Sequence, residues 1–168
     1  MMDLNTVQQD IAQWIERFVE VPHPALGNWP PCPYARRARL NGTYQVQLGV
    51  DLALDLRNIA DRGLSGMEVI VLAYNPKEIS HTDFEQILNE INRLYLLPNN
   101  LLALEDHPDD PEIVNGVCMN QGTYALALVQ SVSDLDAKAR LMASKGFYDS
   151  WPEDYLQQLF HNRQDPRL

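Results

Sequence analysis

The feature that most constrains the fold is a nearly unbroken apolar run at residues 67–74, Met-Glu-Val-Ile-Val-Leu-Ala-Tyr. A strand that faces solvent on one side alternates apolar and polar side chains, and this run hardly alternates at all. A strand of this kind has to be covered on both faces, as interior strands of α/β sheets are. The run therefore predicts a central strand that is buried on both faces.

Helical patterns surround this strand. Apolar residues recur at three- and four-residue intervals in four segments, and Pro152 suits the first position of a fifth helix. These signals predict helices over 3–20, 51–62, 80–96, 133–145 and 152–160. Further strands are predicted over 43–49, 101–104 and 123–130.

The order of these elements indicates the fold class. Because helices separate most of the strands, we expect a single α/β domain over residues 1–168. Its sheet is predicted to be small and mixed, with about four strands and helices packed on it, because the last two strands are joined without a helix. The polar tail at 161–168 is expected to be frayed.

Composition excludes several classes of partner. The chain has 168 residues, with 13 Lys and Arg against 23 Asp and Glu, which gives a net charge of −10. Proteins that bind the phosphate backbone need a cationic face, so we expect no nucleic-acid binding. No apolar run reaches the roughly 18 residues of a membrane span, and the N-terminus lacks a secretory pattern. We therefore expect a cytoplasmic protein with no membrane association, and the oligomeric state stays open.

The cysteine content is low. Two cysteines are too few for a disulfide framework, and no cofactor is predicted. The acidic loop that begins at Glu105 holds several carboxylates and one histidine, but it lacks the spacing of a calcium loop. We interpret it as a solvated turn, and no metal site is predicted.

A Pro-rich segment at 22–42 differs from the rest of this acidic chain. Five prolines between positions 22 and 34 predict a stiff, irregular loop. Three arginines follow, and arginine recognises carboxylates and phosphates through forked hydrogen bonds. The alternative is that the arginines pair with the many carboxylates of the chain. The candidate ligand-binding residues of this segment are Trp29, Tyr34, Arg36, Arg37 and Arg39.

Cys32 lies in the same segment, between Pro31 and Pro33. Neighbouring cations would lower the pKa of its thiol and favour the thiolate. His107 ends a predicted strand, where functional groups of α/β sheets often lie. Cys32, His107 and Asp106 therefore form a candidate catalytic set, in which Asp106 orients the imidazole. The alternative is a cysteine that packs as a small hydrophobic residue.

Two landmarks resemble a known family. The Cys32-Pro33-Tyr34-Ala35 motif and the His107-Pro108 pair follow a tryptophan-bearing first helix in the same order as in the uncharacterised bacterial family DUF1415. The resemblance covers most of the chain in order and spacing. It implies that the Cys32 and His107 regions belong together, and it implies no particular reaction.

These observations predict a small soluble protein that binds an anionic small molecule near Cys32, Arg36 and His107. A cysteine-dependent reaction is left open, so the sequence does not decide whether the protein is an enzyme. The rival interpretation is a non-catalytic accessory module. In that case, the Pro- and Trp-rich loop at 27–39 would dock on a protein partner.

Overall fold

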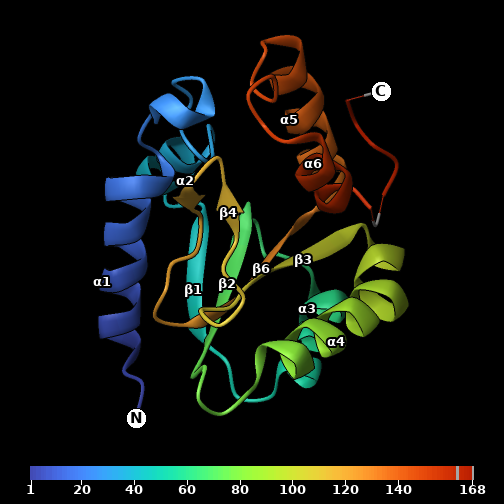
Figure 1. Cartoon of the computed structure of the whole chain (residues 1–168). Coiled ribbons are helices and arrows are strands. Elements are labelled where there is room, and N and C mark those ends of the chain that lie inside the picture. Colours follow the sequence, from blue (N-terminus) through green and yellow to red (C-terminus); the bar gives the residue numbers. More distant parts are fainter. Residues whose placement is uncertain (162, 168) are drawn as a thin grey trace.

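The computed structural model describes residues 1–161 and 163–167, and it shows a single α/β domain around a mixed sheet (Figure 1). The strands of the main sheet lie in the order β1-β2-β6-β3. β1 and β2 are parallel, and β6 is antiparallel to both of its neighbours. The strands are β1 (Tyr44–Leu48), β2 (Val69–Tyr74), β3 (Leu101–Asp106) and β6 (Ala125–Ser131), with a separate pair, β4 (Ile113–Val114) and β5 (Val117–Cys118).

The predicted helices form close to their predicted positions. Asp51, Ser80 and Ser131 each accept a hydrogen bond from the backbone N–H three residues ahead, which caps the helices that follow them. None of the helices in the described residues is long and apolar enough to cross a bilayer. The helices are α1 (Leu4–Trp14, continued by a π-helical turn to Val19), α2 (Ala35–Asn41), α3 (Leu52–Arg62), α4 (His81–Ile91), α5 (Val132–Ser144) and α6 (Glu153–Leu159).

One face of the sheet is covered by α3 and α4 along β2, β3 and β6. The apolar stripes of these helices meet alternate residues of three strands, as the two-residue period of a strand requires. β2 lies between β1 and β6, so its prediction as a central strand is confirmed. The cluster includes Leu56, Ile59, Phe84 and Leu88 from the helices, and Ile70, Leu72, Ala103, Ala127 and Val129 from the strands.

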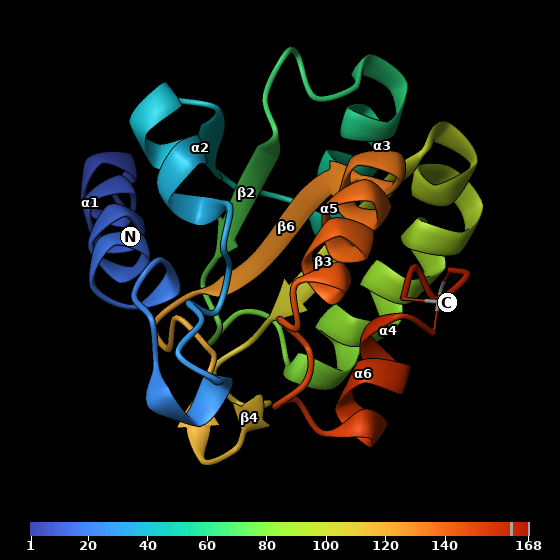
Figure 2. The ribbon, with the colours of Figure 1, turned by 90° about the horizontal axis from the view of Figure 1, so that it is seen from above.

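The opposite face is only partly covered. α1 packs on β1 and on one end of β2 and β6, with Val7 and Ile11 against Val46, Val71 and Leu126. α5 begins directly where β6 ends, and the unit formed by α5 and α6 rises above the sheet (Figures 1 and 2). That unit has its own core cluster, which includes Leu26, Val114, Phe147, Trp151 and Phe160.

Three predicted segments differ from the structure. The second half of the Pro-rich segment at 22–42 is helix α2, since no proline follows Pro33 there. The loop after Asp106 contains the β4–β5 hairpin, whose turn residues Asn115 and Gly116 have φ of 50° and 80°.

The tail was expected to be frayed, yet part of its described stretch is packed. Arg167 forms ion pairs with Glu153 and Asp165, and Pro166 is buried. These contacts hold the tail against α6. The prediction for Asn162 and Leu168 lies outside the described residues.

Candidate functional site

A cavity of about 820 Å³ lies over the part of the sheet that α1 leaves uncovered. Ligand pockets usually measure roughly 300 to 1,000 Å³, so this cavity has the size of a binding site. Its floor consists of side chains on the face opposite α3 and α4. These are Val69 and Val71 from β2, Leu128 and Gln130 from β6, and Leu102 and Leu104 from β3.

The walls of the cavity are rich in aromatic residues. The aromatic residues come from α1 and its continuation, from β1, from the Pro-rich loop, and from the unit of α5 and α6. Six of these aromatic side chains are only half buried. The six are Trp14, Phe18, Tyr34, Tyr44, Tyr148 and Tyr155, beside the buried Phe147, Trp151 and Phe160.

Cys32 borders this cavity, as its position in the Pro-rich loop allows. The residue is accessible to solvent, but protein atoms surround its sulfur, so we infer that the accessible surface belongs to the cavity wall. Burial raises the pKa of the Cys32 thiol, although the backbone N–H groups of Tyr34 and Ala35 and the charge of Lys138 favour the thiolate. The predicted lowering of this pKa by arginines is therefore wrong.

The three arginines are occupied elsewhere or point outward. Arg39 donates to both carboxylate oxygens of Glu20, at 2.9 and 2.7 Å. Arg37 donates to Glu68 at 3.1 Å, while Arg36 is exposed. None of the three borders the cavity, within the part of the chain that the structure describes. The alternative, pairing with carboxylates, is thus confirmed for Arg37 and Arg39.

His107 and Asp106 do not form a catalytic set with Cys32. The fully buried imidazole of His107 accepts from the Asp109 N–H at 3.1 Å through Nδ1, so its Nε2–H donates to the Ile79 carbonyl at 2.9 Å. Asp106 accepts instead from Asn120 at 2.9 Å and from the Gln121 N–H at 3.0 Å. Both residues border the cavity. Their polar groups are used to fix the loop that follows β3, and this leaves no ring nitrogen for a Cys32–His107 bond.

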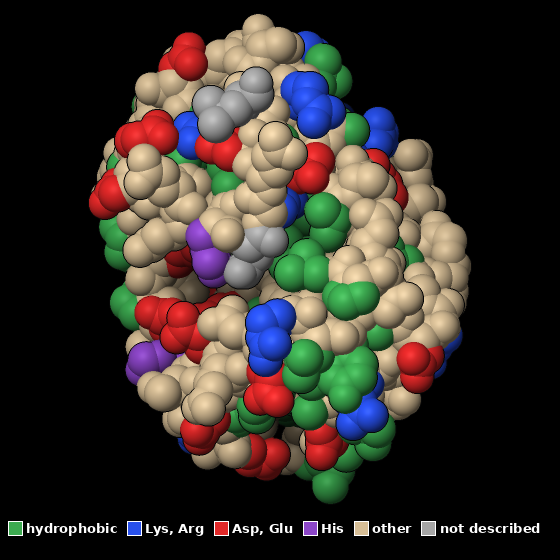
Figure 3. Space-filling view, turned by 90° about the vertical axis from the view of Figure 1, so that its right-hand side faces the viewer, with side chains coloured by type: hydrophobic (Ala, Val, Ile, Leu, Met, Phe, Trp, Pro, Cys, Tyr) green, Lys and Arg blue, Asp and Glu red, His purple; other side chains and the backbone are tan. Residues whose placement is uncertain are grey.

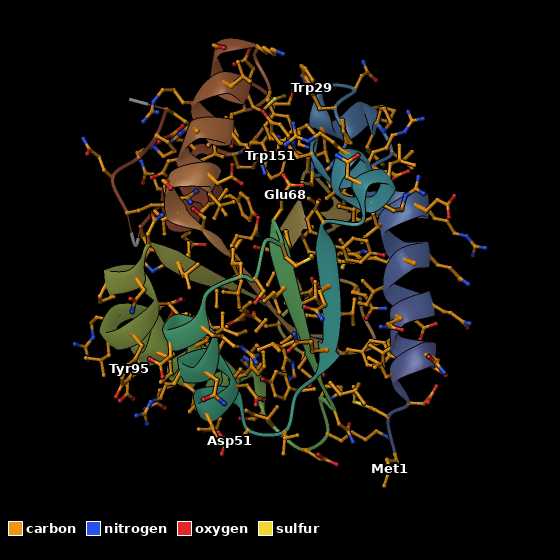
Figure 4. The ribbon with its side chains drawn as sticks, turned by 180° about the vertical axis from the view of Figure 1, so that it is seen from behind. Met1, Trp29, Asp51, Glu68, Tyr95 and Trp151 are labelled. Atoms are coloured by element: carbon orange, nitrogen blue, oxygen red, sulfur yellow. The ribbon has the colours of Figure 1, made fainter. Side chains whose placement is uncertain are left out.

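The aromatic residues of the Pro-rich segment point inward. Trp29 packs edge-on against Phe147, with 5.8 Å between ring centroids, and Figure 4 shows it near Trp151. Tyr34 borders the cavity, with the Lys138 ammonium 5.0 Å from its ring centroid. The loop thus joins the N-terminal half of the chain to the α5–α6 unit.

Sequence reasoning missed Glu68 and Lys138, which both border the cavity. Glu68 lies just before β2, where Figure 4 labels it. Glu68 accepts hydrogen bonds from Thr43, Lys138 and Arg37, and these bonds lower its pKa to about 2. Burial disfavours the charge of Lys138, but its bonds to Asp134 and Glu68 outweigh that effect and raise its pKa. The two residues lie 70 positions apart, so no local sequence signal links them.

Arg163 and Tyr148 were also missed. The Arg163 side chain is 9% exposed and borders the cavity. Its Nε lies 3.2 Å from Asp136 Oδ1, yet neither Nε nor Nη1 makes a hydrogen bond to any described residue. Burial raises the pKa of Tyr148 to about 12, against the opposing charge of Arg163. Because the Tyr148 hydroxyl makes no hydrogen bond within the described residues either, the cavity wall carries unused donors.

A second group of ionisable residues borders the cavity near the end of β3. Burial, aided by Asp110 and Glu85, raises the pKa of Glu105 to about 8. Burial also raises the pKa of Glu112, which accepts from Tyr155 Oη at 2.9 Å. Among the described residues, no group of His, Cys, Asp and Glu has the arrangement of a metal site.

No family model, curated protein or solved structure matches this chain. The resemblance to DUF1415 stays a prediction. The cavity therefore has to be interpreted from its own residues.

Proposed function

We propose that this protein binds a small anionic organic molecule in the cavity above the sheet. The apolar part of the ligand lies on the floor around Leu128, and its anionic group lies at Arg163 and Tyr148. This keeps the predicted class of ligand but moves the anion site, because Arg36 lies outside the cavity wall. Cys32 contributes a wall residue, and its raised pKa supports no nucleophilic role at neutral pH.

The observation that carries this proposal is the uncovered floor of the sheet. Leu128 lies on a strand with neighbours on both sides, yet it is only half buried. Apolar residues at such positions are usually covered, because removing apolar surface from water stabilises the fold. A ligand with an apolar body would cover this surface and gain the same free energy.

The rival proposal, a docking module, has less support. It requires the aromatic residues of the loop at 27–39 to be presented to a partner. Trp29 instead packs against Phe147, and Tyr34 faces the cavity. This loop is thus already occupied by contacts within the chain.

The test uses 8-anilinonaphthalene-1-sulfonate, an apolar anion, in isothermal titration calorimetry. We expect saturable binding with one site per chain, strongly weakened by Leu128→Trp, which places an indole ring over the floor where the ligand would lie. The control is Leu94→Trp, because Leu94 is exposed at 44% and does not border the cavity. Absence of saturable binding, or equal binding by both variants, would refute the proposal.

The two cysteines provide a second readout on the same samples. Cys32 borders the cavity, while Cys118 is exposed on the β4–β5 hairpin. Bound ligand should slow the labelling of Cys32 by iodoacetamide and leave the labelling of Cys118 unchanged. Equal slowing of both cysteines would indicate a global effect and not occupation of the cavity.

A further inference from the structure

The composition of the cavity wall narrows the class of ligand, provided that the proposed function holds. The floor is built mostly from branched aliphatic residues, whereas nine Phe, Tyr and Trp side chains border the cavity around it. Six of these nine are only half buried. Exposed ring surface is best covered by another ring, because aromatic pairs gain from edge-to-face and offset contacts beyond the area they bury. The wall thus favours a ligand with an aromatic body.

The charges near Arg163 limit the charge of the ligand. Among the described residues, the cations near Tyr148 are Arg163 and Arg167, and their carboxylate partners are Asp136, Asp165 and Glu153. The group therefore carries no excess positive charge before a ligand enters. Since like charges disfavour one another at short range, this end tolerates one added negative charge far better than two.

The donors at this end suit a carboxylate. Arg163 is held with its guanidinium carbon 5.0 Å from the centroid of the Phe160 ring, so the planar fork has a fixed orientation. Its Nη1 has no partner among the described residues, and the Tyr148 ring packs on the same Phe160 ring, with 5.8 Å between the two ring centroids. A guanidinium fork with an added hydroxyl matches the two oxygens of a carboxylate.

We infer that the cavity binds an aromatic monocarboxylate, with the carboxylate at Arg163 and Tyr148 and the ring between the sheet floor and the aromatic walls. Aliphatic acids, aryl phosphates and neutral aromatic molecules are the alternatives. Each of them differs from the inferred ligand in one property only. A set of matched probes therefore separates them.

The experiment measures the affinity of four probes by calorimetry at pH 7. The probes are 2-naphthoate, the neutral naphthalene-2-carboxamide, the dianionic 2-naphthyl phosphate and the aliphatic decanoate. We expect 2-naphthoate to bind about 10- to 100-fold more tightly than the carboxamide, the range for charge-assisted hydrogen bonds. The phosphate and decanoate should both bind more weakly than 2-naphthoate.

Single-residue variants test whether Arg163 and Tyr148 bind the carboxylate of 2-naphthoate. Arg163→Gln should bring the affinity for 2-naphthoate to within about threefold of that for the carboxamide. Arg140→Gln should change neither, because Arg140 is exposed on α5 and does not border the cavity. Tyr148→Phe removes only the hydroxyl and should weaken 2-naphthoate about three- to tenfold. If Arg163→Gln fails to fold in thermal denaturation, Tyr148→Phe carries the same test.

The outcomes separate this inference from the proposed function. Equal or tighter binding of decanoate would overturn the aromatic class, and equal or tighter binding of the phosphate would overturn the single charge. Binding of 8-anilinonaphthalene-1-sulfonate without binding of 2-naphthoate would overturn the carboxylate and leave the proposed function standing. Failure of every probe, including the sulfonate, would remove the proposed function and this inference together.

Discussion

The two faces of the main sheet are built from similar residues and are covered differently. On one face, α3 and α4 bury Leu72 to 2% exposure and Ala127 to 0%. On the other face, α1 covers Leu126 completely, while Leu128, two residues along the same strand, borders the cavity. The comparison shows that an apolar residue on a strand can be a core residue or a cavity floor, depending on what lies above it.

The connections between strands explain this difference. α3 joins the parallel strands β1 and β2, so it has to cross the face of the sheet. α5 follows β6 at its end and rises away from the sheet, and it packs with Phe147 and Trp151 in a separate cluster (Figure 1). One half of the second face is left without a helix for this reason.

Figure 3 shows the surface on the side of the molecule that lies at the right in Figure 1. Hydrophobic side chains gather near the middle of that face, with acidic and basic side chains around them. The charged residues there include both signs, although the chain as a whole is acidic.

The largest expected difference in the free energy of unfolding is between alanine variants of Leu126 and Leu128. Leu126→Ala should lower the free energy of unfolding by about 4 kcal/mol, because it leaves a void in a packed core. Leu128→Ala should lower it by less than about 1 kcal/mol, because this side chain already borders empty space. Urea denaturation of the two variants measures both values. Equal losses would show that the cavity is closed and packed in solution.

A smaller loss of stability is expected from a substitution beside β3, the edge strand of the main sheet. The buried Asn92 side chain bonds to both backbone groups of Ala103, donating to the carbonyl at 2.9 Å and accepting from the N–H at 2.8 Å. It thereby takes the place of a further strand beside β3. Asn92→Leu would leave these groups unpaired and should cost about 2 to 3 kcal/mol in denaturation.

The control for Asn92 is Asn89→Leu, since Asn89 is exposed on α4. This variant should change the free energy of unfolding by less than about 0.5 kcal/mol. If Asn92→Leu proved as mild as the control, water would be replacing Asn92 at this edge. In that case the edge of β3 would be as open as the cavity face.

The smallest effect concerns Glu68 at the cavity edge. Its pKa is lowered to about 2 in the folded protein, so its contribution to stability is complete above its ordinary value of 4.5 and is lost as the pH falls through about 2. Glu68→Gln should cost about 1 to 2 kcal/mol at pH 7, allowing for partial exposure, and close to nothing near pH 2.

The measurement compares urea denaturation of the wild type and Glu68→Gln between pH 7 and pH 2. Glu90→Gln on α4 is the control, since Glu90 is exposed. A difference between wild type and Glu68→Gln that stayed constant over this range would contradict the ion-pair explanation. The stabilisation by Glu68 would then have to come from packing.

Much of the fold could be predicted from the sequence, because local patterns of apolar residues indicate where its helices and strands lie. The apolar run at 67–74 indicated a central strand, and helical spacing located four of the helices. These patterns arise because the buried side chains of one helix or strand recur at the period of that element, so they can be read within a short stretch of sequence.

Less could be predicted of the candidate site. Cys32 and Tyr34 do border the cavity, but the roles of the arginines and of His107 depended on partners such as Glu20 and Ile79.

The sequence by itself determined the elements, the mixed α/β sheet and the acidic character of the chain. Only the tertiary structure decided which face of the sheet stays uncovered and which polar groups face the cavity. Arg163 illustrates the reason, because it lies in a polar tail for which the sequence predicts fraying, yet it is buried beside Asp136 and Phe160. Side chains brought together from distant parts of the chain leave no local pattern, since their proximity arises only when the helices pack.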